Sequence, residues 1–231
     1  MESHGSIFMI IQTKIDYFFN NLPRTLLLLP LHGAVLLPKA QLPIPISDPN
    51  YLALIAESVK TDRFIGLVQP MLHLDEEEDD FSRLFKAGSV GKITEITEME
   101  NNRLVVTLTG VCRFDIIEEL PRDDNFRKAL VSYDRYDTDL AEESDFSFDR
   151  TRLLKALGQY FEQLDIVPNW QEIDRTSNEK LITALAMVCP FEAREKQALL
   201  ESPNLKEQSK IITTLIEMAA LEMGSNSETC H

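Results

Sequence analysis

The residues that could do chemistry do not form a recognised catalytic motif. The chain has four histidines, and none stands in an HExxH pattern or at metal-ligand spacing from a cysteine: His4, His32, His73 and His231. The run Gly88-Ser-Val-Gly-Lys92 resembles a phosphate-binding loop, but its first glycine is misplaced and Ile93 follows the lysine instead of Ser or Thr. No GxSxG nucleophile elbow occurs. The sequence therefore predicts no metal site and no cofactor.

The cysteines and carboxylates do not change this expectation. Cys112, Cys189 and Cys230 are too few and too far apart for a disulfide framework, and they fit buried thiols in a reducing cytoplasm. With 38 Asp and Glu in the chain, accidental carboxylate pairs are common, so pairing alone indicates no glycosidase chemistry. Although catalytic triads assemble from distant positions, we expect a protein that is not an enzyme.

The charge excludes some partner classes. The formal net charge is −15, and no basic patch interrupts it, so a nucleic-acid phosphate backbone would be repelled. No run of about 18 apolar residues occurs, and Ile7–Ile11 is preceded by Glu2 rather than by a cation, unlike a signal peptide. We expect a cytoplasmic protein with no membrane or nucleic-acid partner.

The first half of the chain has the pattern of strands. Short apolar runs bounded by turn residues occur at 26–31, 41–46 and 64–68. Pro30, Pro43 and Pro45 cannot donate to a ladder, so these strands are expected at sheet edges, at bulges or broken at the proline.

Turn and cap signals divide the rest of this half. Ser47-Asp-Pro49 predicts a helix start, because a Ser or Asp cap precedes a proline at the first helical position. Residues 88–119 predict further strands with a hairpin turn at Asn101-Asn102, and 129–136 predict the last strand.

After residue 148 the apolar period changes from 2 to 3.6. Helices are predicted over about 153–164, 176–188, 191–201 and 205–223, with Gly224 ending the last of them. The fold class expected is α+β, a β-rich domain followed by a small helical bundle. The expected boundaries are an N-terminal extension 1–22, a β domain 23–136, an acidic linker 137–148, a bundle 149–223 and a disordered tail 224–231.

The N-terminal 21 residues allow two interpretations. An apolar stripe at helical spacing predicts a short amphipathic helix: Ile7, Ile11, Ile15, Phe18 and Leu22. Alternatively, translation begins at Met9. The sequence does not separate these.

Four blocks in order resemble one known family. They are LPLHGAVLLPKAQLPIPI with DPNY and RFIGLVQP, then 85–96, then 102–114 and finally 190–201. The series, from about Thr25 to Met223, resembles the Lon protease N-terminal, substrate-binding domain. It departs from the family at Lys39, where members usually have Gly, and at Asn50, where they often have Arg.

This resemblance implies a PUA-like pseudo-barrel of strands followed by an α-helical bundle. The chain resembles stand-alone bacterial members of the family that lack the ATPase and peptidase domains. The implied function is therefore non-catalytic recognition of polypeptides, as an adaptor in protein quality control. The expected partners are unfolded or tagged polypeptides, and a protease or chaperone. An RNA-binding role, by analogy with PUA-like barrels, is the alternative.

Polypeptide binding would need exposed apolar side chains beside strand edges. The candidates lie in the first loop and around the acidic loop: Val35, Leu36, Leu37, Met71, Phe81, Leu84 and Phe85. For any single one of these residues, packing inside the domain is the more ordinary role.

Overall fold

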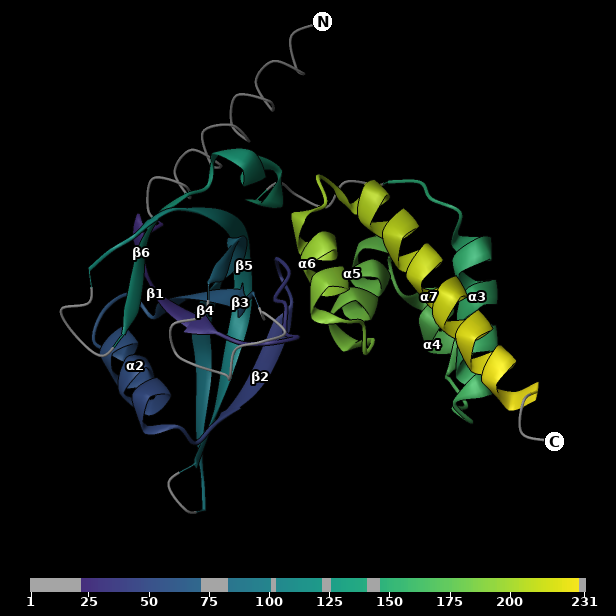
Figure 1. The fold of residues 1–231 in the computed structure, drawn as a ribbon, viewed down its shortest axis with the longest axis horizontal. Coiled ribbons are helices and arrows are strands. Elements are labelled where there is room, and N and C mark those ends of the chain that lie inside the picture. The colour runs from purple at the N-terminus through teal and green to yellow at the C-terminus, as the bar shows by residue number, and fades with distance from the viewer. Residues whose placement is uncertain (1–21, 72–82, 101–102, 122–125, 141–145, 229–231) are drawn as a thin grey trace, which may run out of the picture. The chain divides into compact units, whose positions relative to one another are not determined.

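The computed structural model describes residues 22–71, 83–100, 103–121, 126–140 and 146–228 of the 231-residue chain. The chain divides into two compact units, 1–142 and 143–231 (Figure 1). Among the described residues, the strands lie in the first unit and the second unit is helical, so the predicted α+β class is confirmed.

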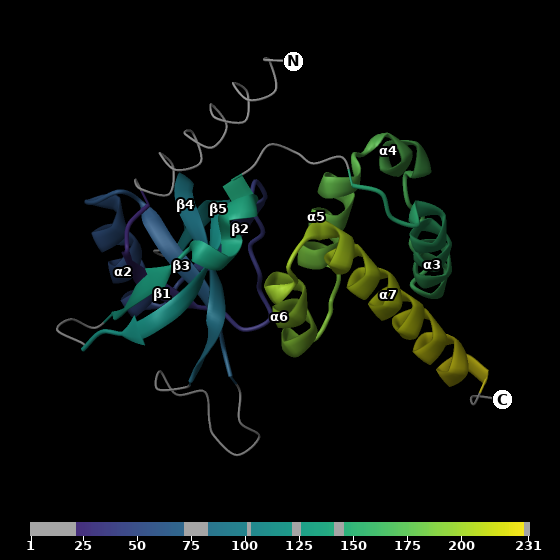
Figure 2. The same ribbon diagram turned by 90° about the horizontal axis from the view of Figure 1, so that it is seen from above.

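The first unit is built on one six-stranded sheet. Its strands are β1 (Thr25–Pro30), β2 (Gln41–Ile46), β3 (Phe64–Pro70), β4 (Leu84–Met99), β5 (Arg103–Glu119) and β6 (Arg127–Ser132). The order is β2-β5-β4-β3-β1-β6, and a further pairing of β5 with β6 closes the last five strands into a barrel. Only β1 and β3 pair in parallel, and helix α2 (Pro49–Val59) connects β2 to β3 (Figure 2). Asp48 Oδ1 accepts from Asn50 N–H at 2.7 Å, which confirms the predicted helix start.

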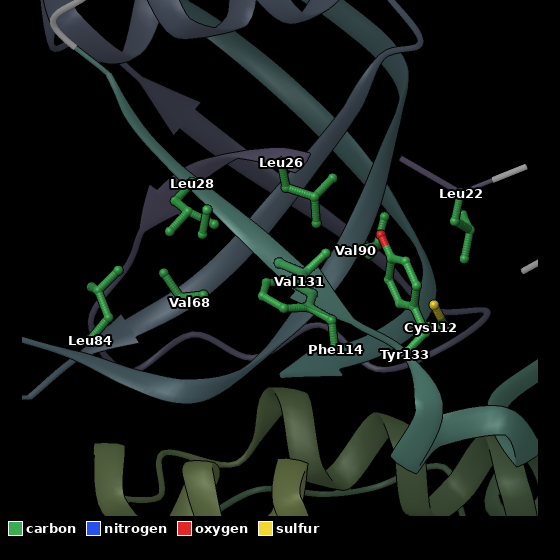
Figure 3. Close-up of a cluster of buried hydrophobic side chains, with 11 residues drawn as sticks. Leu22, Leu26, Leu28, Val68, Leu84, Val90, Cys112, Phe114, Val131 and Tyr133 are labelled. Atoms are coloured by element: carbon green, nitrogen blue, oxygen red, sulfur yellow. The ribbon is translucent and has the colours of Figure 1, made fainter. Parts of the chain in front are cut away.

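The barrel is filled by apolar side chains that alternate along its strands. Eleven buried residues form one cluster: Leu22, Leu26, Leu28, Val68, Leu84, Val90, Cys112, Phe114, Ala129, Val131 and Tyr133 (Figure 3). Leu22 belongs to this cluster, which corrects its assignment to an N-terminal extension. The rest of that expected extension, 1–21, lies outside the described residues.

The prolines lie where a ladder tolerates them. Pro30 is the last residue of β1, and β2 pairs with β5 alone among the described strands. Gly110 N–H donates to Ala40 O at 2.8 Å, and in an antiparallel pair alternate residues point at the partner. Pro43 and Pro45 therefore turn their nitrogens away from β5, and the prediction of an edge strand is confirmed.

The segment after β6 differs from the expected strand end and linker. Residues Asp134–Leu140 form a 3-10 helix, η1, whereas 129–136 were expected as strand and 137–148 as linker. The reason is tertiary: Tyr136 is buried, and Asp139 accepts hydrogen bonds from the Arg113 side chain and backbone of β5. A polar sequence thus becomes part of the barrel unit.

The described part of the second unit, residues 146–228, contains five helices: α3 (Arg150–Gln163), α4 (Trp170–Arg175), α5 (Asn178–Val188), α6 (Ala193–Glu201) and α7 (Leu205–Glu228). Its buried side chains include Leu153, Leu157, Ile182, Leu199, Ile212 and Ile216. The short α4 was not anticipated. Helix α7 continues past Gly224 to Glu228, which corrects the expected tail, because one glycine weakens a helix by only about 1 kcal/mol and no proline follows.

Candidate functional site

Three of the seven sequence-predicted binding residues are buried inside the barrel unit. Val35, Leu36 and Leu37 are 3%, 0% and 3% exposed, which corrects the expectation that they form an open binding surface. The space that they fill is provided by glycines. A Cβ on Gly91 would lie 2.9 Å from Leu36 Cδ2, and a Cβ on Gly110 would lie 2.1 Å from Leu37 O. The loop therefore packs on the sheet.

The other predicted residues lie around the junction of β3 and β4. Leu84 is buried in the barrel cluster, Met71 and Phe85 are half-buried, and Phe81 lies outside the described residues. Met71 N–H donates to Arg83 O at 2.6 Å, so the two sides of this junction are held together. Met71 and Phe85 offer only partial apolar surface.

Four exposed apolar side chains of the second unit lie close together in sequence, from the end of α3 to the start of α4. We call Leu164, Ile166, Val167 and Trp170 the α3–α4 patch; Val167 is 96% exposed. Four large apolar side chains within seven residues are not explained by the core of this unit. Sequence reasoning missed them, although the run Leu164-Asp-Ile-Val-Pro-Asn-Trp170 was visible as apolar residues at a helix end.

Backbone hydrogen bonds hold the first part of the α3–α4 patch in place. Asp165 takes a left-handed conformation, φ 53°, after the end of α3. Its N–H donates to Glu162 O, and Ile166 N–H donates to Phe161 O at 2.9 Å, which is the Schellman arrangement of a helix C-terminus. The apolar side chains are thus displayed by an ordered turn.

The second part of the α3–α4 patch is fixed by aromatic packing and by one arginine. The Trp170 ring lies edge-on to Phe161, with centroids 6.3 Å apart. Arg150 of α3 donates to Ile173 O at 2.6 Å and to Thr176 O at 3.0 Å, which ties the C-terminal end of α4 to α3. This anchoring presents Trp170 on a supported helix, which reduces the entropy lost when a partner binds.

A second exposed apolar region lies on the hairpin of β4 and β5. Ile96 and Met99 of β4 are 39% and 55% exposed. Between them Thr97 and Glu98 are exposed as well. The alternating sequence predicted a strand here. It did not show that β3 ends at Lys92 of β4, which leaves the edge of β4 beyond that residue without a neighbouring strand on that side among those described.

The two buried cysteine thiols, Cys112 and Cys189, have raised pKa values, which is unfavourable for nucleophilic chemistry. Burial raises the pKa of the Cys112 thiol, and nearby Asp139 raises it further. Burial also raises the pKa of Cys189 to about 11. Both thiols are therefore protonated at neutral pH, and a protonated thiol is a poor nucleophile.

The described residues contain no cluster of three His, Cys, Asp or Glu that could hold a metal ion. Among the helices of these same residues, none combines the length and the apolar character needed to cross a membrane.

The described residues thus form a closed barrel and a helical unit, each with exposed apolar side chains. The family model that matches this chain is the ATP-dependent protease La (LON) substrate-binding domain, over residues 25–218. The chain belongs to this family, and the resemblance inferred from its sequence blocks is confirmed.

Curated relatives and solved structures agree with this assignment. The chain is 25% identical to Lon protease 2 of Myxococcus xanthus and 26% identical to Lon protease of Brevibacillus choshinensis. These matches cover 85% and 87% of this chain but 24% and 26% of the relatives, so the chain spans about a quarter of their length. The fold resembles a Lon N-terminal domain protein from Xanthomonas campestris, with a TM-score of 0.57, 20% identity and coverage of 82% of this chain and 97% of that one.

Proposed function

We propose that this protein binds unfolded polypeptides without cleaving them and acts as an adaptor in protein quality control. The observation that carries the proposal is the match of residues 25–218 to a substrate-binding domain family. In this role the protein would hold a client chain for a separate protease or chaperone. Its own described residues contribute surface and no reaction.

The α3–α4 patch supports this proposal physically. Binding of an unfolded chain is driven by burial of apolar area, at about 25 cal/mol per Å². The α3–α4 patch offers such area on a preorganised turn, with Val167 almost fully exposed. A single site of this size leaves little free energy after the entropy cost of association, so we expect a Kd on the order of micromolar or weaker. In the barrel unit, Met71 and Phe85 are further candidates.

Charge gives the proposed clients a bias. With a net charge of −15, the protein attracts chains rich in Lys and Arg and repels acidic ones. This long-range attraction acts mainly on the association rate and is screened over about 10 Å at 0.1 M salt. We therefore expect binding of basic unfolded chains to weaken as salt is added.

The test is a titration of the full chain with a fluorescently labelled, unfolded basic protein at low and at high salt. We expect weak, saturable binding by the wild type. Val167→Ser removes exposed apolar area without disturbing the core, and it should weaken binding at both salt concentrations by about three-fold or more.

Val188→Ser is the matched control. Val188 is 81% exposed at the end of α5, outside the α3–α4 patch, and loses the same apolar atoms on substitution. Its affinity should equal that of the wild type. If the wild type binds no unfolded chain under any condition, the proposed function is wrong. If Val167→Ser and Val188→Ser weaken binding of the unfolded chain equally, the α3–α4 patch is not the binding surface.

A further inference from the structure

The far half of β4 is a strand edge with only one neighbour. β4 pairs with β3 as far as Lys92, and Ile93 N–H still donates to Arg63 O at 2.8 Å. Residues 95–99 then pair with β5 alone among the strands described, as β4 and β5 run on past the end of β3 (Figure 1). We call Glu95–Met99 the distal β4 edge. Its outer backbone groups have no described strand to bond with.

The opposite edge of the β4–β5 hairpin, which β2 forms, is closed to strand addition. There β2 covers β5, and Pro43 and Pro45 turn towards the outside, as described above. A proline has no N–H, so a strand arriving at β2 would lose two donors in succession. The distal β4 edge contains no proline and keeps every donor and acceptor.

The side chains of the distal β4 edge combine apolar and acidic character. Ile96 and Met99 are exposed apolar groups, and Thr97 favours extended backbone. Glu95 and Glu98 are exposed, and neither takes part in any of the ion pairs found among the described residues. The edge therefore carries two carboxylates available to a partner.

We propose that the distal β4 edge binds an extended polypeptide segment, rich in Lys or Arg between apolar residues, by adding it to the sheet as a new strand. The proposal rests on the proposed function and names where and how a client is held. Only an extended backbone satisfies a row of unpaired N–H and C=O groups. Cross-strand pairs of opposite charge favour basic residues next to Glu95 and Glu98.

A second copy of this chain is a poorer occupant of the same edge. Two distal β4 edges brought together would place Glu95 and Glu98 of one copy beside the same carboxylates of the other. Like charges on adjacent strands are destabilising. Acidic side chains thus protect this edge from self-association and leave it open to a basic strand.

The probe is a short peptide that repeats Lys-Val-Val, titrated against the full chain at low salt. Glu95 and Glu98 lie on opposite faces of β4, and this spacing places lysines on both faces of an added strand. This Lys–Val peptide is compared with two others: one has Glu in place of each Lys, and one is the Lys–Val peptide with alternate backbone nitrogens methylated. Strand addition requires that the Lys–Val peptide binds and that the other two bind much more weakly, since they lose the charge match or the backbone donors.

The protein variants are Glu95→Lys with Glu98→Lys, and the control Asp62→Lys with Asp137→Lys. The control residues are exposed in the same unit and change the net charge by the same amount. The edge variant should lose about ten-fold or more in affinity for the Lys–Val peptide, and the control should lose clearly less. Hydrogen exchange adds a direct readout, since bound peptide should protect amides within 95–99 from exchange.

The outcomes separate this inference from the proposed function. If the unfolded basic protein binds but the edge variant and the control behave alike, or the amides of 95–99 gain no protection, the distal β4 edge is not the site. If the methylated peptide binds as well as the unmethylated one, charge alone explains the binding, and strand addition is wrong. If neither the unfolded basic protein nor any peptide binds the wild type, the proposed function itself fails.

Discussion

At the scale of single residues, the best-connected interaction in the barrel unit is the pair Arg113–Asp139. Arg113 Nη2 lies 2.6 Å from Asp139 Oδ1, and the two side chains are only 7% and 6% exposed. The guanidinium also lies 4.5 Å from the centre of the Tyr136 ring. A buried charge pair is costly to desolvate, so it adds little net stability. Its structural effect is to fix the position of η1 on β5.

Asp139→Ala should destabilise the protein by about 3–5 kcal/mol, because it leaves the Arg113 charge buried without its counter-charge. Urea unfolding followed by circular dichroism measures this loss. Replacing both partners, Arg113→Met with Asp139→Leu, should recover only part of it, since the buried charge is gone but Arg113 N–H still loses the carboxylate that accepts its hydrogen bond.

Asp115→Ala is the control for this substitution. Asp115 pairs with Arg135 at 2.8 Å, but these side chains are 30% and 53% exposed. Water screens the pair, so we expect a loss below about 1 kcal/mol. A loss as large as that of Asp139→Ala would contradict the argument from burial.

At the scale of elements, the loop between β1 and β2 holds a strained residue by hydrogen bonds. Lys39 takes a left-handed conformation with φ 65°, which residues with a side chain rarely adopt. Hydrogen bonds require this geometry: Lys39 N–H donates to Gly110 O at 2.9 Å, and Gly110 N–H donates to Ala40 O. A lysine in this conformation costs roughly 1–2 kcal/mol.

Lys39→Gly should therefore stabilise the protein, by about 0.5–1 kcal/mol after the greater freedom of glycine in the unfolded chain is counted. The measurement is the midpoint of urea unfolding. Gly33→Ala is the matched opposite: Gly33 has φ 66°, and a Cβ there would meet nothing within 4 Å, so only backbone strain acts. It should destabilise by a similar amount. If Lys39→Gly lowers stability, contacts of the lysine side chain outweigh its backbone strain.

At the scale of the whole molecule, each unit buries side chains whose pKa is raised, so that they stay protonated to higher pH than in the unfolded chain. Burial raises the pKa of Cys112 and Tyr133 in the barrel unit and that of Cys189, to about 11, in the helical unit. In each case the folded state holds a proton that the unfolded state releases first. Folding stability is therefore complete below the ordinary thiol pKa of 9.0 and falls as the pH rises above it.

The free energy of unfolding should accordingly decrease from about pH 9 upwards, by at most about 1.4 kcal/mol per pH unit for each buried thiol. Cys112→Ala should unfold with a shallower dependence on pH, because the group that releases the proton is gone. Urea unfolding at about pH 8 and about pH 10 gives the slope for each variant. The same slope in wild type and variant would show that Cys112 does not contribute.

The sequence by itself determined the α+β class, the edge position of β2 and the cap of α2, because these follow from local rules of period, proline and side-chain capping. Its ordered blocks also carried the resemblance to the family. It did not determine which apolar residues are exposed. Leu36 and Val167 are both apolar loop residues, yet glycines at 91 and 110 make room for Leu36, while nothing in the helical unit covers Val167. Likewise, η1 is held in place because Asp139 accepts a hydrogen bond from Arg113, 26 residues earlier in the chain. The distal β4 edge is open because β3 pairs with β4 no further than Lys92. Burial and pairing of this kind depend on residues far apart in the chain, so only the tertiary structure decides them.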